Sequence, residues 1–294
     1  MLSSILCKSI SMAEDSPIRN VADTALWVAT YRADESARPD ALFHDRQAGM
    51  LAGDRGRSIA ASMPYPAMMS WLLVIRTVAI DRLVLKAISL GVDTVVNLGA
   101  GLDTRPYRME LPASLRWIEV DFLNTITYKN EKLAGEKPVC RLERIALDLS
   151  DINLRRSLFQ RIGSESQSAL IITEGVIMYL SSDDAAALSR DLLAVPSFHF
   201  WIQDYRQNAT KQRMPRRMKR VFKDSPFRFD KDEWLSFFAG HGWTIDEKIL
   251  AYDESVRVKR PVPLVFPWKL LTLITPKKIQ EKWRQSSGYV LYRK

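Results

Sequence analysis

The strongest constraint on the fold is an alternation of short β-branched runs with helical segments after residue 90. The first run, "TVVNLG", ends in glycine and is typical of a buried parallel strand. Further runs with strand character lie at 116–121, 142–149, 169–175 and 197–204. Helical or polar stretches separate them, at 122–133, 154–162 and 183–193, the last with Ser181 or Ser182 as its N-cap. Strands that alternate with helices predict an α/β fold with a doubly wound, Rossmann-like parallel sheet.

The flanking segments extend this sheet at both ends. Apolar residues at three-to-four spacing predict helices over residues 18–90, with Gly91 as a C-cap. Two more strands are expected late in the chain, at 243–250 and 288–294. Five early βα units and a late strand pair match a seven-stranded sheet better than the six-stranded sheet of a dehydrogenase.

The loop after the first strand, Gly99-Ala-Gly-Leu-Asp-Thr104, would lie at the carboxyl edge of the sheet, where such folds bind ligands. A dinucleotide fingerprint requires a third glycine three residues after the second, but Thr104 stands there. Asp103 also places a carboxylate where a pyrophosphate would be repelled. Both departures argue against NAD and FAD.

Acidic residues end the next three predicted strands. Asp121 could accept hydrogen bonds from ribose hydroxyls, Asp148 could accept from an adenine amine while Leu149 covers the ring, and Glu174 could face a sulfonium. Taken singly, each acid could equally be a helix N-cap or an exposed loop residue. Together at successive strand ends, they predict S-adenosylmethionine, a nucleotide without phosphate.

Five stretches of this sequence resemble one known family: "ARPDALFHDRQA", "VIRTVAIDRLV", "VVNLGAGLDTRPYRM", "WIEVDF" and "IITEGVIMYLS". They are similar to the leucine carboxyl methyltransferases, class I enzymes that include tetracenomycin-type polyketide O-methyltransferases, from about Ala29 to Leu193. The resemblance implies that Arg76 reaches the carboxylate of S-adenosylmethionine, although Asp81 is an alternative partner for this arginine. It also implies a set of cofactor-binding residues: Gly99, Gly101, Asp121, Asp148, Leu149 and Glu174.

The methyl acceptor is constrained less tightly. A carboxylate is already ionised at neutral pH and needs no general base, whereas a phenol would benefit from one. None of the three histidines stands at a predicted strand exit, which favours carboxylate over hydroxyl methylation. Arg105, Tyr179 and Tyr205 are the candidates for orienting the acceptor, but Arg105 could instead anchor the first loop and Tyr179 could be packing.

We therefore expect an O-methyltransferase that acts on a carboxylate or hydroxyl of a small molecule in bacterial secondary metabolism, such as polyketide biosynthesis. The alternatives are a methyltransferase for a protein's C-terminal carboxylate, or a module that binds nucleic acid or a carrier protein. The chain is expected to form a single domain with four parts: a helical part at 1–90, a cofactor-binding core at 91–205, a basic cap insertion at 206–230 and an acceptor-side segment at 231–294.

Seven of the nine excess positive charges lie in "KQRMPRRMKRVFK", residues 211–223. This patch could be a solvated helix face or a docking site for an acidic or carrier protein. Nucleic acid is an unlikely partner because only Phe222 interleaves the cations. We expect no membrane span, because no window approaches the roughly 18 apolar residues required. Cys7 and Cys140 lack metal-ligand spacing, so we expect no metal, no disulfide and a reducing cytoplasm.

Overall fold

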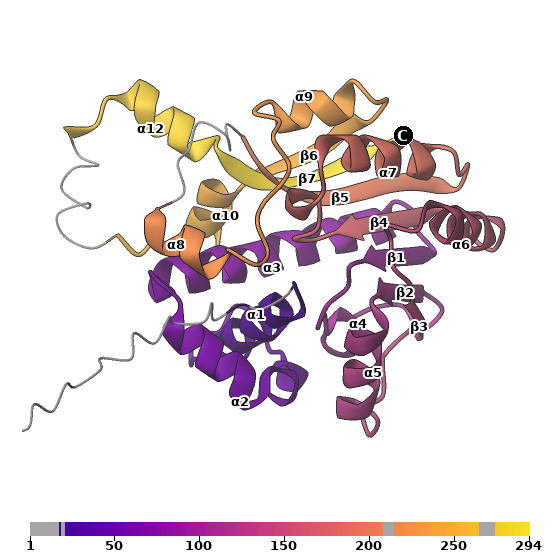
Figure 1. The fold of residues 1–294 in the computed structure, drawn as a ribbon, viewed down its shortest axis with the longest axis horizontal. Coiled ribbons are helices and arrows are strands. Elements are labelled where there is room, and N and C mark those ends of the chain that lie inside the picture. The colour runs from indigo at the N-terminus through magenta and orange to yellow at the C-terminus, as the bar shows by residue number, and fades with distance from the viewer. Residues whose placement is uncertain (1–17, 19–20, 208–214, 265–273) are drawn as a thin grey trace, which may run out of the picture.

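A seven-stranded sheet runs through the middle of the molecule in the order β3-β2-β1-β4-β5-β7-β6 (Figure 1). The computed structural model describes residues 18, 21–207, 215–264 and 274–294. Strands β1 to β5 are parallel, and β7 is antiparallel to both β5 and β6. This confirms the predicted α/β class and the seven-stranded sheet. The strands are β1 Thr94–Leu98, β2 Arg116–Asp121, β3 Arg141–Ala146, β4 Ala169–Thr173, β5 Phe198–Arg206, β6 Thr244–Leu250 and β7 Ser287–Arg293.

Three long helices precede the sheet, as the apolar periodicity predicts: α1 Val21–Ser36, α2 Arg46–Ser62 and α3 Pro66–Ser89. Helix α3 ends just before Gly91, whose φ of +94° provides the left-handed turn expected at this C-terminus. Among the described residues, the other helical elements are α4 Arg105–Arg108, α5 Leu123–Lys132, α6 Ile152–Ser164, η1 Ile177–Tyr179, α7 Ser182–Leu193, α8 Arg216–Val221, α9 Trp234–Ala239, α10 Ala251–Arg257 and α12 Lys277–Arg284.

Both faces of the sheet are buried. Val96 of β1 packs on one face in a cluster that includes Phe159 of α6 and Leu188 of α7. Its neighbour Val95 packs on the other face with Ile80 of α3. Since successive strand residues point to opposite faces, burial on both sides explains the continuous apolar runs.

Three strand ends differ from the sequence prediction by two residues or more. β4 stops at Thr173 rather than at residue 175. β3 stops at Ala146 rather than at residue 149, because Asp148 folds back and accepts a hydrogen bond from the Ser150 amide at 2.8 Å. Asp151 then caps α6. β5 continues two residues beyond the predicted end, because its pairing with β7 extends to Arg206 opposite Ser287.

Helix α8 belongs to the expected cap insertion and packs on the amino-terminal helices. Met218, Val221 and Phe222 join a cluster that contains Trp27 of α1 and Leu73 of α3. The α8 helix lies at the same end of the molecule as α10 and α12 (Figure 1). In the part of the chain that the structure describes, no helix is both long and apolar enough to cross a membrane.

Candidate cofactor and acceptor site

The loop after β1 depends on glycine at two places. Gly99 has φ +64° and Gly101 has φ +49°, a region that side chains rarely adopt. A Cβ atom on Gly99 would lie 2.6 Å from Cγ2 of Val176, and one on Gly101 would lie 3.2 Å from Cβ of Ala25. The loop is therefore held closely between helix α1 and the chain that follows β4.

Asp103 and Thr104 point into the protein from this loop. Asp103 accepts hydrogen bonds from Asn97 Nδ2 at 2.7 Å and from the Arg105 amide at 2.9 Å. Burial alone would raise the pKa of Asp103, but the charges of Arg105 and Lys129 outweigh it and hold this pKa well below its usual range. The Thr104 hydroxyl donates to Asp45 Oδ2 at 2.5 Å. Both side chains thus fix the loop to its surroundings.

Asp121 supports the same loop from the end of β2. Its Oδ2 atom accepts from the Gly101 amide at 2.7 Å and its Oδ1 atom accepts from the Phe122 amide at 2.7 Å. Each carboxylate oxygen can accept a second hydrogen bond, so Asp121 retains capacity for a ligand hydroxyl. Asp148 and Leu149 line the same cavity, as do both glycines.

Glu174 lies between two arginines directly after β4. Its oxygens pair with Arg76 Nε at 2.7 Å and with Arg105 Nη2 at 2.9 Å. Burial alone would raise the pKa of Glu174, but these two charges hold it below its usual value. Asp81, the alternative partner expected for Arg76, instead pairs with Arg105 at 2.7 Å and with Arg108 at 2.6 Å.

These ion pairs link into one network of carboxylates and guanidinium groups. The buried ammonium of Lys129 also acts on Asp103, so the charges of this region nearly balance within the protein. Its described members are Arg32, Arg76, Arg105, Arg108, Asp45, Asp81, Asp103, Glu174 and Asp204.

The three acceptor-orienting candidates all line the cavity, in different ways. Arg105 is 2% exposed and pairs with Asp81, Asp103 and Glu174, which matches its alternative role as an anchor of the loop. Tyr179 packs edge-on against Phe227, and burial raises its pKa to about 12. Tyr205 is 3% exposed, and burial raises its pKa further.

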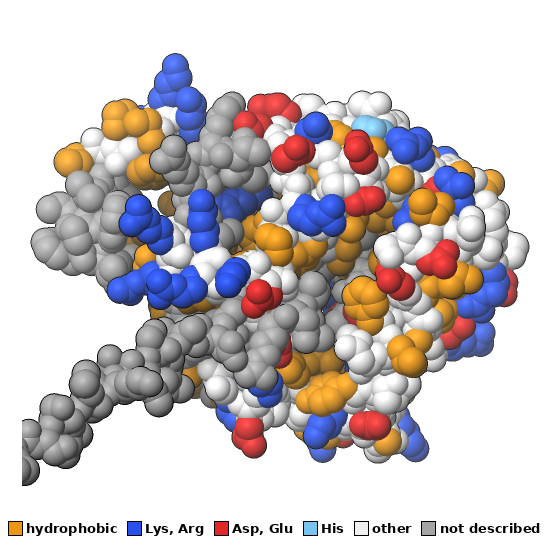
Figure 2. Space-filling model, viewed as in Figure 1, with side chains coloured by type: hydrophobic (Ala, Val, Ile, Leu, Met, Phe, Trp, Pro, Cys, Tyr) orange, Lys and Arg blue, Asp and Glu red, His pale blue; other side chains and the backbone are white. Residues whose placement is uncertain are grey.

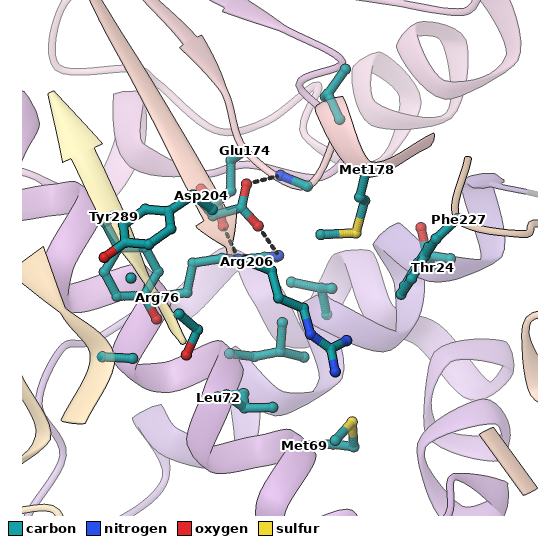
Figure 3. A pocket seen from close by; sticks show the side chains of 18 of the residues that line it. Thr24, Met69, Leu72, Arg76, Glu174, Met178, Asp204, Arg206, Phe227 and Tyr289 are labelled. Carbon is teal, nitrogen blue, oxygen red and sulfur yellow. Dashed lines mark hydrogen bonds and ion pairs between the residues drawn. The ribbon is translucent and has the colours of Figure 1, made fainter. Parts of the chain in front are cut away.

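Two site residues at the end of β5 were missed by the sequence prediction (Figure 3). Asp204 Oδ1 accepts from the Gly175 amide at 2.8 Å, and Oδ2 lies 3.6 Å from Arg76 Nη1. Burial raises the pKa of Asp204, and Arg76 offsets only part of this shift. Arg206 extends away from this cluster toward the side of the cavity formed by α3, and burial lowers its pKa. Asp204, an acid that ends the predicted fifth strand, fits the same pattern as the acids that end the three earlier strands, whereas Arg206 lies beyond the predicted end of that strand and has no such signal.

The cavity continues far beyond the glycine loop. It has a volume of about 2960 Å³ and is lined by α3, α8, α10 and α12 as well as by the strand ends. Near Arg206 its wall is apolar and includes Met69, Leu72, Met178 and Phe227 (Figure 3). A charged end therefore opens directly into an apolar chamber.

The amino-acid sequence of this chain is similar to those of known proteins. The family model described as leucine carboxyl methyltransferase matches residues 25–192. A relative from Rhodococcus jostii is 28% identical and aligns over 84% of this chain and 90% of its own length. One from Mycobacterium avium is 31% identical over 89% of this chain and 92% of its own length. Both carry the name "Putative S-adenosyl-L-methionine-dependent methyltransferase".

Solved structures show a similar fold. A DUF574 family protein from Streptomyces avermitilis superposes with a TM-score of 0.53 at 14% identity, covering 90% of this chain and 96% of its own. A protein from Thermobifida fusca whose title reads "putative methyltransferase" gives a TM-score of 0.53 at 16% identity, covering 95% of this chain and 96% of its own. At these identities, the likeness concerns the fold.

Proposed function

Because this chain belongs to the leucine carboxyl methyltransferase family and is an S-adenosylmethionine-dependent methyltransferase, we propose that it methylates an oxygen atom of a small-molecule carboxylate. The main support is Arg206, a cation that extends into an apolar chamber next to the charged end of the cavity. On the family resemblance, we further propose an acceptor from bacterial secondary metabolism, such as a polyketide.

The residues of the charged end fit the cofactor. The backbone of both glycines lines the cavity, and the Glu174 carboxylate at the charged end suits a cationic group. When bound, S-adenosylmethionine supplies a methyl carbon that its sulfonium activates. We propose that Gly99 and Gly101 form the floor of its site and that Asp121 holds the ribose hydroxyls. Asp148 and Leu149 would hold the adenine, and Arg76 and Glu174 the amino-acid end.

Arg206 would orient the acceptor oxygen. A carboxylate is ionised at neutral pH, so a guanidinium that fixes its direction suffices and no proton has to be removed. Arg105 is then a positioning residue of the loop, while Tyr179 and Tyr205 form part of the wall. A hydroxyl acceptor would need a base instead, and Asp204, whose pKa is raised by burial, is the residue placed to serve as one.

One experiment separates these acceptors. The purified protein is incubated with methyl-labelled S-adenosylmethionine and a bacterial organic extract, and the labelled product is treated with alkali. A carboxyl ester releases the label as methanol, a methyl ether retains it, and label in protein bands indicates a protein substrate. We expect alkali-released label in the organic phase.

Variants test the assigned residues. Arg206→Gln should reduce methyl transfer at least about tenfold while its affinity for S-adenosylhomocysteine, measured by calorimetry, stays within about twofold of wild type. Arg206→Lys should recover part of the activity, and Arg116→Gln, which removes an exposed ion pair with Glu165, is the control. Alkali-stable label that disappears in Asp204→Asn would refute the carboxylate proposal.

The basic patch at 211–223 remains a predicted docking site for an acidic or carrier protein. Residues 211–214 lie outside the described part of the chain. In α8, Arg216, Arg217, Lys219 and Arg220 are exposed while Met218 is buried, so the cations face solvent. Reversing these four charges should weaken transfer to a carrier-bound acceptor, in a salt-dependent manner, by more than it weakens transfer to the free acceptor.

A further inference from the structure

The cavity is too large for a methyl donor and a compact acceptor alone. Ligand sites for drug-sized molecules typically measure about 300–1,000 Å³, whereas this cavity measures about 2960 Å³. We propose that the acceptor is a long amphiphile, with its carboxylate at Arg206 and an extended apolar tail in the outer part of the cavity. This inference rests on the proposed function, because it assumes methyl transfer at the inner end.

The outer part of the cavity is mostly apolar and comes from segments far apart in sequence. We call it the outer gallery. Its apolar residues are Met68, Trp71 and Leu72 on α3, Val256 on α10, Val262 after that helix and Trp283 on α12. A mostly apolar wall of this kind suits an alkyl or polycyclic tail better than a peptide, whose backbone groups would need partners there.

Several polar groups in and beside the gallery pair within the protein. Trp71 Nε1 donates to the Arg260 carbonyl at 2.9 Å. The guanidinium of Arg260 pairs with Glu35 at 2.8 Å, and that of Arg284 pairs with Asp253 at 2.5 Å. These pairs leave mainly carbon surface for a tail to cover.

Several side chains in and beside the outer gallery are more exposed than apolar residues of their size usually are. Val256 is 59% exposed, Trp283 is 55% exposed and Tyr252 is 49% exposed. A concentration of exposed apolar side chains in one region marks a binding surface. A tail that covers them would remove this surface from water.

Basic side chains also lie at this end of the molecule. Lys259 and Lys277 line the cavity, together with the acidic Asp40 and Glu281, and Figure 2 shows basic and hydrophobic side chains intermingled at the end of the molecule that carries α8 and α12. The lysines would attract the carboxylate of an anionic amphiphile. These lysines and the apolar gallery therefore fit one class of ligand.

A series of alkanoates tests this inference. Hexanoate, decanoate and tetradecanoate, each below its micelle concentration, are titrated into the protein saturated with S-adenosylhomocysteine. We expect affinity to rise about fourfold for each added methylene that the gallery buries. Affinity that does not change with chain length, or binding of none of the three, would overturn the inference.

Two residues on α12 provide a matched pair of variants. Trp283 lines the cavity, whereas Ile279, which is 42% exposed on the same helix, is absent from its lining. Trp283→Ala should lower affinity for tetradecanoate at least about fivefold and leave hexanoate unchanged. Ile279→Ala should change neither, and equal losses in the two variants would overturn the inference.

The outcomes also separate this inference from the proposed function. If affinity does not depend on chain length but S-adenosylhomocysteine binds normally, only the proposal of a long tail is refuted. If S-adenosylhomocysteine does not bind, the proposed methyl transfer at the inner end is refuted. Both substituted side chains are exposed on a surface helix, so thermal unfolding should match wild type and verify that the variants fold.

Discussion

Gly99→Ala should disturb the cofactor loop by two separable effects. The first is backbone strain, because an L-residue at φ +64° costs about 1–2 kcal/mol. The second is a clash, since the new Cβ would lie 2.6 Å from Cγ2 of Val176, and overpacking of this kind costs about 1–3 kcal/mol. We expect the free energy of unfolding to fall by about 2–5 kcal/mol. The affinity for S-adenosylhomocysteine should fall at least about tenfold, because the loop must shift.

A double-mutant cycle isolates the clash. Removing Cγ2 with Val176→Ala leaves Val176 Cβ as the nearest atom of that residue, at 3.9 Å, an ordinary contact distance. The double variant should therefore be about 1–3 kcal/mol more stable than the sum of the single effects. Urea unfolding curves measure each stability, and calorimetry measures each affinity.

Gly91→Ala is the control for strain without a clash. Gly91 has φ +94°, and a Cβ there would meet no atom within 4 Å. The Gly91→Ala variant should lose only about 1–2 kcal/mol of unfolding free energy and should bind S-adenosylhomocysteine like wild type. The reasoning is refuted if Gly99→Ala is no more destabilising than Gly91→Ala, or if the cycle gives no coupling energy.

Two further predictions concern buried charges. Glu119→Gln should lower the free energy of unfolding by about 3–5 kcal/mol, because it strands the fully buried Lys129 ammonium now 2.8 Å from the carboxylate. Lys129→Met should cost less, since Arg144 still pairs with Glu119, and equal shifts in urea midpoint would contradict this. Burial alone would raise the pKa of Asp45, but Arg32, Arg108 and the Thr104 hydroxyl together outweigh burial and lower this pKa. The ionised Asp45 therefore stabilises the fold above its ordinary pKa near 3.9, and this stabilisation is lost as pH falls through the lower pKa of the folded state. Asp45→Asn should reduce the loss of unfolding free energy between about pH 5 and pH 2. If the free energy of unfolding depends on pH in the same way in this variant and in wild type, the assignment is wrong.

The sheet could be predicted from the sequence because its signals are local. The β2 prediction at 116–121 matches the structure, since a strand buried on both faces reads as a continuous apolar run. The end of β3 could not be predicted, because the turn at Asp148 depends on a side chain that folds back on its own backbone. Short helices such as α10 and α12 also escaped, because one or two turns give too little periodicity.

The site could be predicted only in part because its side chains pair over long sequence distances. Asp81 on α3 looked like a neighbour for Arg76 but lies against Arg105, 24 residues away in sequence. The position at which β5 ends depends on β7, since the pairing of Arg206 with Ser287 extends the strand past the predicted end. No local pattern contains either of these contacts.

The departures of the first loop from a dinucleotide fingerprint acquire a spatial meaning in the structure. Thr104 takes the place of the third glycine and donates to Asp45, the N-cap of α2. Asp45 also pairs with Arg32 of α1, which donates in turn to the Leu102 carbonyl at 2.5 Å. The amino-terminal helices are thus tied directly to the loop, and Ala25 of α1 stands where a side chain at position 101 would lie. The Gly101 amide, which a pyrophosphate would need as a donor, already donates to Asp121 Oδ2 at 2.7 Å, and this argues against a dinucleotide independently of the charge of Asp103.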